Sequence, residues 1–152
     1  MNIFNVRVYG ILINDNHEVL VSDEWIHDTR ITKFCGGGLE WGEGTIDCLK
    51  REFKEEMKLP IEIIKHIYTT DFYVQSMFTP SHQIISIYYQ VKPLAPIQVP
   101  IKKIPFDYDE EQLSTYATTG ETAAFRFIPW ANFSDLTVDL PIDKVVARML
   151  KQ

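Results

Sequence analysis

The stretch Gly36–Leu59, GGGLEWGEGTIDCLKREFKEEMKL, determines the fold and the site that the sequence predicts. It holds five of the chain's seven glycines and six of its 21 acidic residues. Glycine lets a backbone turn or approach another group closely, and acidic side chains repel one another when they are crowded. Both concentrations are therefore typical of a site with a specific chemistry.

The second half of this stretch, from about Thr45 to Met57, has the periodicity of an amphipathic helix. At 100° per residue, four apolar side chains fall in one stripe that is predicted to face the core: Ile46, Leu49, Phe53 and Met57. Three acids, Glu52, Glu55 and Glu56, occupy another flank. Like charges at this spacing destabilise a helix, so a cation is expected to offset their repulsion.

Two explanations of this acidic flank are open from the helix alone. In the first, the flank is a solvated surface on which Arg51 and Lys58 pair with Glu55 at helical spacing. In the second, the acids bind a hard divalent ion. Mg²⁺ prefers oxygen ligands and is typically shared between one or two carboxylates and the phosphates of a substrate. The second explanation would make an acidic surface into a phosphate site.

The glycines do not belong to either of the two best-known phosphate-binding motifs. A P-loop needs a lysine after its second glycine, but Gly44 is followed by Thr45. A dinucleotide-binding fingerprint that starts at Gly36 or at Gly42 lacks its third glycine. The acids of the loop would also repel a phosphate that approached this backbone without a cation.

The order of residues resembles the signature of the Nudix hydrolase family, G-x5-E-x7-R-E-U-x-E-E-x-G-U, in which U is a bulky apolar residue. The residues that match are Gly37, Glu43, Arg51, Glu52, Glu55, Glu56 and Leu59, with Phe53 at the first apolar position. Lys58 stands where the family has glycine, and Cys35 stands where many members have proline. A combination with this spacing rarely arises by chance.

The resemblance implies a fold and a reaction. The implied fold is an α/β/α sandwich with a mixed β-sheet between helices, and residues 1–152 are expected to form a single Nudix domain. The implied reaction is the metal-dependent hydrolysis of a phosphoanhydride bond in a nucleoside diphosphate linked to a group X. A (deoxy)nucleoside triphosphate is the first substrate expected of so short a chain, and ADP-ribose or another nucleotide sugar is the alternative. A nucleotide sensor without catalysis is disfavoured because the acids that a hydrolase needs are all present.

The resemblance also implies roles for the matching residues. Glu55 and Glu56 are expected to bind the metal directly, with Mg²⁺ as the first choice and Mn²⁺ as the alternative. Glu52 is expected to be a third ligand or to orient the attacking water. Arg51 is expected to tie the loop acid Glu43 to the helix rather than to contact substrate.

Further residues are candidates for supporting roles. Gly37 and Gly38 are expected to let the chain turn into the site without a Cβ atom in the way. Arg30 and Lys33 could contact a substrate phosphate or be ordinary surface cations. Six aromatic residues could stack on a base or belong to the core: Trp25, Trp41, Phe72, Tyr73, Tyr88 and Tyr89.

The signature does not assign the base that activates the attacking water. Three late acids are candidates: Glu110, Glu111 and Glu121. Glu121 is placed first because it directly precedes the predicted strand Thr122–Ile128, which would hold a carboxylate rigidly. The other two lie in a predicted acidic loop, and Glu52 is the remaining alternative.

The rest of the chain reads as strands that flank the central helix, with a second helix at the end. A hairpin is predicted from Val6–Ile13 and Glu18–Ser22, with a turn at Asn14–His17. Further strands are predicted at Ile61–Val74 and Gln83–Val91. Four prolines between 93 and 105 exclude a central strand or helix there and indicate a surface connection or a sheet edge. A loop is predicted over Phe106–Gly120, and a helix over Leu140–Leu150.

Composition limits the class of protein. A net charge of −6 argues against a large nucleic-acid-binding surface, and no apolar run reaches the roughly 20 residues of a membrane helix. Cys35 and Cys48 have neither disulfide-framework nor zinc-site spacing, so both are expected to be reduced thiols. The expected location is the cytoplasm, and the expected partner is a small nucleotide, with a homodimer left open.

Overall fold

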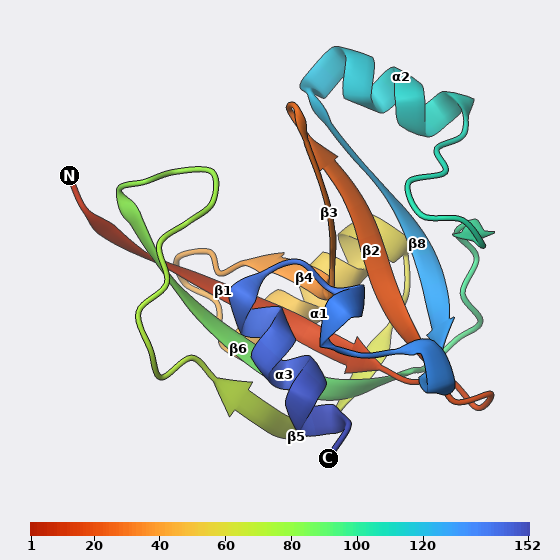
Figure 1. Cartoon of the computed structure of the whole chain (residues 1–152), viewed down its shortest axis with the longest axis horizontal. Helices are drawn as coiled ribbons and strands as arrows, with labels where there is room; N and C mark the ends of the chain where they lie inside the picture. The colour runs from red at the N-terminus through yellow and green to blue at the C-terminus, as the bar shows by residue number, and fades with distance from the viewer. The chain divides into compact units, whose positions relative to one another are not determined.

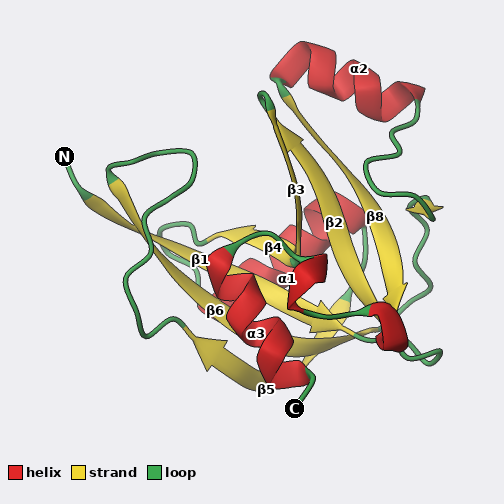
Figure 2. Ribbon diagram, viewed as in Figure 1, coloured by secondary structure: helices red, strands yellow, loops and turns green.

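The computed structural model describes all residues, 1–152, as two mixed β-sheets and three α-helices (Figures 1 and 2). The elements are β1 (Ile3–Leu12), β2 (Glu18–Ile26), β3 (Thr29–Lys33), β4 (Cys35–Gly38), α1 (Thr45–Met57), β5 (Ile61–Thr69), β6 (His82–Pro93), β7 (Ile101–Lys102), α2 (Glu110–Thr119), β8 (Glu121–Pro129) and α3 (Pro141–Leu150), with two 3₁₀ helices, η1 (Trp130–Asn132) and η2 (Asp135–Thr137). Two compact units share these elements. The first is Met1–Leu12 with Cys35–Gln98, and the second is Ile13–Phe34 with Val99–Gln152.

The first unit contains the sheet of order β4-β1-β6-β5 and the helix α1. β1 runs parallel to β6 and antiparallel to β4, so the sheet is mixed. Leu49, Phe53 and Met57 of α1 are buried, and the ring of Phe53 lies over Gly10 of β1. A Cβ atom at Gly10 would lie 2.8 Å from Phe53 Cε1, so glycine permits this close approach.

The helix α1 has the predicted bounds, Thr45–Met57. It ends at Lys58, whose φ of 52° and ψ of 33° are left-handed. Ile46 is 41 % exposed, so the prediction that it faces the core is wrong. Helical periodicity gives the direction of a side chain but not the extent of the strands that cover it, and the buried face begins only at Cys48 and Leu49.

The second unit contains the sheet of order β3-β2-β8-β7 with α2 and α3. β2 pairs antiparallel with β3 and with β8, and β7 pairs parallel with β8. β7 lies at the edge of the sheet, as the four prolines indicated. The predicted strand Thr122–Ile128 and helix Leu140–Leu150 are confirmed as β8 and α3, and Pro141 is in the first turn of α3.

The predicted hairpin between Val6–Ile13 and Glu18–Ser22 is wrong. The two strands that form here, β1 and β2, belong to different sheets, and only Ile13 and Val19 form an isolated bridge. The turn itself is present, because Asn14 Oδ1 accepts hydrogen bonds from two backbone N–H groups. Turn residues specify a reversal of the chain, but they do not specify which strands pair after it.

The predicted loop Phe106–Gly120 is also wrong, because it contains α2. Asp109 caps this helix by accepting a hydrogen bond from the Gln112 backbone, and the Gln112 side chain accepts one from the Asp109 N–H. Gly120 ends the helix with a φ of 79°. No side chain of α2 is buried, so the helix lacks the apolar stripe by which a sequence reveals a helix.

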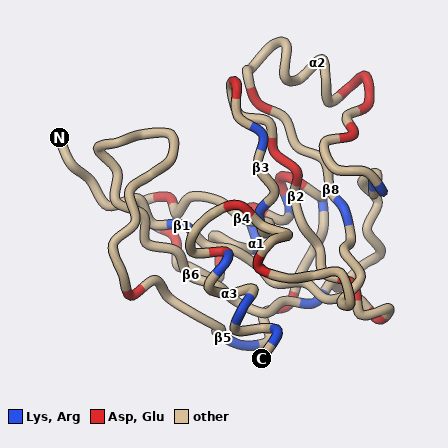
Figure 3. The backbone as a smooth tube through the Cα atoms, in the orientation of Figure 1, with Lys and Arg blue, Asp and Glu red and all other residues tan.

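Charged residues occur along most of the chain, but residues 72–91 contain no Lys, Arg, Asp or Glu (Figure 3). None of the three α-helices has the length and apolar composition that a membrane-spanning helix requires. Cys35 and Cys48 are both buried and form no disulfide bond.

Candidate active site

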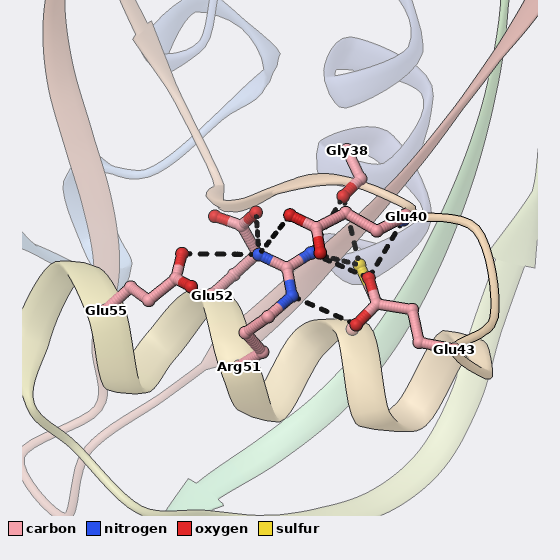
Figure 4. A network of polar contacts seen from close by, with 7 residues as sticks. Gly38, Glu40, Glu43, Arg51, Glu52 and Glu55 are labelled. Atoms are coloured by element: carbon pink, nitrogen blue, oxygen red, sulfur yellow. Dashed lines mark hydrogen bonds and ion pairs between the residues drawn. The ribbon is translucent and has the colours of Figure 1, made fainter.

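Arg51 of α1 lies at the centre of a polar network in the first unit (Figure 4). Its Nε donates to Glu43 Oε2 at 2.9 Å, and its Nη2 donates to Glu43 Oε1 at 2.7 Å. Nη2 also donates to the carbonyl oxygen of Gly38 at 3.0 Å. The bidentate pair ties the loop after β4 to the helix, and the Gly38 bond ties both to the strand.

The remaining nitrogen of Arg51 faces the acidic flank of α1. Nη1 donates to Glu52 Oε1 at 3.0 Å and to Glu55 Oε2 at 3.2 Å, and it lies 3.6 Å from Glu40 Oε1. The side chain of Glu52 is 13 % exposed, whereas those of Glu55 and Glu40 are 60 % and 68 % exposed. One guanidinium therefore gathers one shielded and two open carboxylates, in addition to Glu43.

Glu52 is also fixed from the strand side. A Cβ atom added to Gly37 would lie 2.4 Å from Glu52 Cδ and within 2.6 Å of both carboxylate oxygens. The carboxylate therefore packs directly on the backbone of β4. Gly38 differs, since the nearest atom to its Cβ position is Arg7 Nη1 at 3.6 Å. Of the two glycines predicted to make room, Gly37 is the one that the site requires.

The network fixes protonation states as well as positions. The hydrogen bond from Arg51 is the main reason that the pKa of Glu43 is lowered from 4.5 to about 2, and the Glu40 N–H adds to this effect. The bond to Glu43 likewise raises the pKa of Arg51 above its ordinary value. Burial raises the pKa of the Cys48 thiol to about 12, with a further contribution from Glu43. At neutral pH the network therefore holds an ionised Glu43, a charged Arg51 and a protonated thiol.

The acidic flank suits a hard cation by the kind of its donors. Glu52, Glu55 and Glu56 offer only carboxylate oxygens, and Glu55 and Glu56 are exposed. No group of three or more His, Cys, Asp or Glu side chains is arranged to hold a metal ion, since Glu52 and Glu55 point to Arg51. The residues therefore fit a divalent ion in chemistry, although the cation that they meet in the structure is a guanidinium.

The sequence of the chain matches the NUDIX domain over residues 4–150. This match covers far more than half of the chain. The chain belongs to the Nudix family. Members of the family generally use divalent metal ions and act on small nucleotides.

Solved structures of other Nudix proteins share the fold. The MutT Nudix hydrolase from Burkholderia pseudomallei has a TM-score of 0.65 at 11 % identity, with 96 % of this chain and 97 % of that chain covered. The MutT protein from Methanosarcina mazei Go1 has a TM-score of 0.63 at 14 % identity, with 99 % and 98 % covered. An ADP-ribose pyrophosphatase from Streptococcus suis has a TM-score of 0.56 at 13 % identity, with 97 % and 92 % covered. These matches confirm the predicted α/β/α sandwich fold, and no curated protein matches in sequence.

The Nudix signature does not include the two predicted phosphate-binding cations, which lie in the second unit. Lys33 is 4 % exposed, and its Nζ lies 2.9 Å from Glu24 Oε2 and donates to the Phe34 carbonyl oxygen. Arg30 is exposed and places its guanidinium 4.3 Å from the centre of the Trp25 ring. Lys33 therefore has a buried structural partner, whereas the charge of Arg30 remains open to solvent.

The three late acids that are candidate bases of this Nudix protein also lie in the second unit. Glu121 is exposed and is the first residue of β8, where it pairs with Ile26. Glu110 and Glu111 are exposed in the first turn of α2, not in a loop. All three acids therefore lie in a helix or a strand. Glu121 was ranked first because the other two were expected in a loop, and the structure removes that reason.

The aromatic residues divide into core and surface. Tyr88 is fully buried, and the hydroxyl groups of Tyr89 and Thr45 lie 2.7 Å apart. Tyr116 stacks on Trp25 with ring centres 3.6 Å apart, and the Arg30 guanidinium lies 4.3 Å from the centre of the same ring, so Trp25 already has partners within the protein. Three of the six are exposed in the first unit: Trp41, Phe72 and Tyr73.

A buried ion pair in the second unit was not predicted. Asp23 is fully buried, and its carboxylate accepts hydrogen bonds from Arg126, from the Thr32 hydroxyl at 2.7 Å and from the Phe106 N–H at 3.3 Å. The sequence feature that could have indicated this pair is a charged residue within each of two largely apolar strands, Asp23 in β2 and Arg126 in β8. The pair joins β2, β3 and β8 to the segment before α2, so its contacts are those of a structural network.

Proposed function

We propose that this Nudix protein is a divalent-metal-dependent pyrophosphohydrolase whose first substrate class is the (deoxy)nucleoside triphosphates. The observation that supports the proposal best is the arrangement around Arg51. One guanidinium holds the loop by Glu43 and gathers Glu52 and Glu55 on the flank of α1. The proposal takes residues 1–152 as one catalytic domain, because the family match runs over residues 4–150.

Glu52, Glu55 and Glu56 would hold Mg²⁺, with Mn²⁺ as the alternative. The ion, when bound, stabilises charge on the phosphoryl oxygens and lowers the pKa of a water molecule. Gly37 makes room for the Glu52 carboxylate, and the Arg51–Glu43 pair keeps the loop in place. Arg30 is the first candidate to contact a substrate phosphate, because Lys33 would have to leave Glu24.

The ligand roles are tested by Glu55→Gln and Glu56→Gln, each at saturating Mg²⁺. Each variant should lose at least about tenfold in kcat, because a ligand charge is removed while the exposed side chain leaves the fold intact. Glu62→Gln is the matched control, since Glu62 is an exposed acid of β5 that pairs with Lys92. Near-wild-type turnover in either site variant would remove that residue from the ligand set.

The base is tested by the pH dependence of kcat/KM. The candidate bases are Glu121, Glu110, Glu111 and Glu52, and Glu121 is tested first because it is the one that begins a strand. Replacing the base by glutamine should cause a large loss of kcat/KM and abolish the acidic limb of the profile. An unchanged rate and limb in Glu121→Gln would transfer the role to one of the other three acids.

Substrate choice has a second candidate, ADP-ribose, because one neighbour of the same fold is an ADP-ribose pyrophosphatase. A panel of nucleoside triphosphates, nucleotide sugars and dinucleotides with Mg²⁺ would decide, with products identified as a nucleoside monophosphate and the phosphorylated remainder. Thermal stabilisation by a nucleotide without turnover would instead support a sensor. The buried cysteines form no disulfide bond, and we propose a cytoplasmic location. Light scattering would test whether the protein forms a homodimer.

A further inference from the structure

Arg51 divides its donors between two sets of acceptors. The Nε and Nη2 edge donates to Glu43 and to the carbonyl oxygen of Gly38, at 2.7 to 3.0 Å. Nη1 donates to Glu52 at 3.0 Å and to Glu55 at 3.2 Å (Figure 4). The first set belongs to the loop and the strand. The second set consists of two of the three acids that are proposed to hold the metal.

We propose that Arg51 Nη1 is an exchangeable counter-ion, which holds Glu52 and Glu55 together and gives them up when a divalent cation binds. The inference rests on the proposed metal site and adds a competitor to it. Arginine and a metal ion need the same carboxylate oxygens, and their like charges repel each other. Arg51 therefore lowers the affinity of the site for metal, although it also prevents the acids from moving apart.

Burial indicates which contacts can exchange. Glu55 is 60 % exposed, and an ion pair in contact with solvent is weakly held. Glu52 is 13 % exposed and packs on Gly37, so its carboxylate stays in place on the strand when Nη1 withdraws. Arg51 is 22 % exposed and stays anchored through its other edge. The exchange thus needs only Nη1 to lose its acceptors.

The test measures Mn²⁺ affinity by electron paramagnetic resonance of the unbound ion, which requires no turnover. Arg51→Gln should tighten Mn²⁺ binding by at least about fivefold, because a nearby positive charge is removed. Glu43→Gln removes the same ion pair between the loop and the helix. It leaves the positive charge of Arg51 without the balancing charge of Glu43, so it should weaken Mn²⁺ binding. Lys50→Gln removes an exposed positive charge of the same helix and should change the affinity by less than about twofold, because solvent screens it.

A purely structural Arg51 predicts a different result. If Arg51 only held the loop, Arg51→Gln and Glu43→Gln would both weaken Mn²⁺ binding, and that result would overturn the inference. Unchanged binding in Arg51→Gln would overturn it as well. Absence of Mn²⁺ binding in the wild-type protein, or unchanged binding in Glu55→Gln, would instead remove the proposed metal site on which the inference rests.

A second measurement on the wild-type protein does not depend on the folding of a variant. In a Mg²⁺ titration followed by ¹⁵N side-chain NMR, the Nη1 resonance of Arg51 should shift and exchange its protons faster. The Nε resonance should keep its shift, because the Glu43 contact remains. A titration in which both resonances stay unchanged while Mg²⁺ binds would overturn the inference.

Discussion

Lys58 holds the left-handed conformation that ends α1, with a φ of 52°, although it carries a Cβ atom. Its N–H donates to the Lys54 carbonyl oxygen, so the helix ends there with a normal closing bond. The family's glycine would adopt this geometry without steric cost. The departure from the signature is therefore a matter of backbone energy, not of catalytic chemistry.

Lys58→Gly should stabilise the protein by about 1 kcal/mol, because glycine removes the left-handed penalty. For a chain of this size, that is a rise in Tm of about 2–4 °C, with little change in kcat. Lys50→Gly, in the interior of the same helix, is the control and should lower the Tm. A lower Tm for Lys58→Gly would show that the Lys58 side chain contributes more than its backbone strain costs.

Gly37 is the second residue at which the presence or absence of a Cβ atom is decisive, here for the position of the Glu52 carboxylate. Gly37→Ala would place a methyl group 2.4 Å from Glu52 Cδ, so the carboxylate must move. We expect a loss of at least about tenfold in kcat with the fold retained, because misplacement by about 1 Å can be that costly. Gly38→Ala is the control on the same strand, since its nearest neighbour would be 3.6 Å away. Equal losses in both variants would contradict the assigned role of Gly37.

At the scale of elements, the loop after β4 and the helix α1 are joined by one ion pair whose strength depends on pH. The folded pKa of Glu43, about 2, lies below its ordinary value of 4.5. Between these values the unfolded chain binds more protons than the folded protein. The contribution of the pair to stability is therefore complete above about pH 4.5 and is lost as the pH falls toward 2.

Wild-type protein should consequently lose more stability than Glu43→Gln when it is acidified from about pH 5 to about pH 2.5. Urea unfolding at a series of pH values measures this difference, which isolates Glu43 from the other acids that titrate in the same range. Parallel stability curves for the two proteins would show that the Arg51–Glu43 pair does not shift the pKa of Glu43.

The sequence predicted α1 and the order of its functional residues because both depend on local spacing. Helical period places Glu52, Glu55 and Glu56 on one flank, and the family signature identifies Arg51 as the link to Glu43. Helical spacing offered the Arg51–Glu55 pair as one of two explanations of the acidic flank, and the structure contains this pair. Helical spacing did not indicate the contact between Arg51 and its neighbour Glu52. α2 was missed for a related reason, since its capping box lies outside any apolar pattern.

Contacts between distant segments were the least predictable part. Lys33 was predicted to contact a substrate phosphate or to be a surface cation, but the fold buries it beside Glu24. The contact between Asp23 and Arg126 was equally unpredictable. These residues are 103 positions apart in the chain and meet only when β2 pairs with β8. Residue type and local period carry no information about such pairing.

At the scale of the whole molecule, the proposed metal site predicts that Mg²⁺ stabilises the folded protein. A ligand at about 100 times its Kd contributes about 2.7 kcal/mol to the free energy of unfolding. The Tm should therefore rise with added Mg²⁺ and fall back with a chelator, and the double variant Glu55→Gln with Glu56→Gln should show little response. An equal rise in the double variant would place the stabilising ion elsewhere on the protein.

The two units are interleaved along the chain, since each is built from two separate segments. β1 pairs with β6, which begins at His82, and β2 pairs with β8, which begins only at Glu121. At about 5–20 residues per second, a ribosome would deliver β6 roughly 4–14 s after β1 is complete. During that time β1 and β2 lack these partners and can pair with other nascent chains. Neither sheet can therefore be completed early in synthesis, and chaperone binding should concentrate on these two strands.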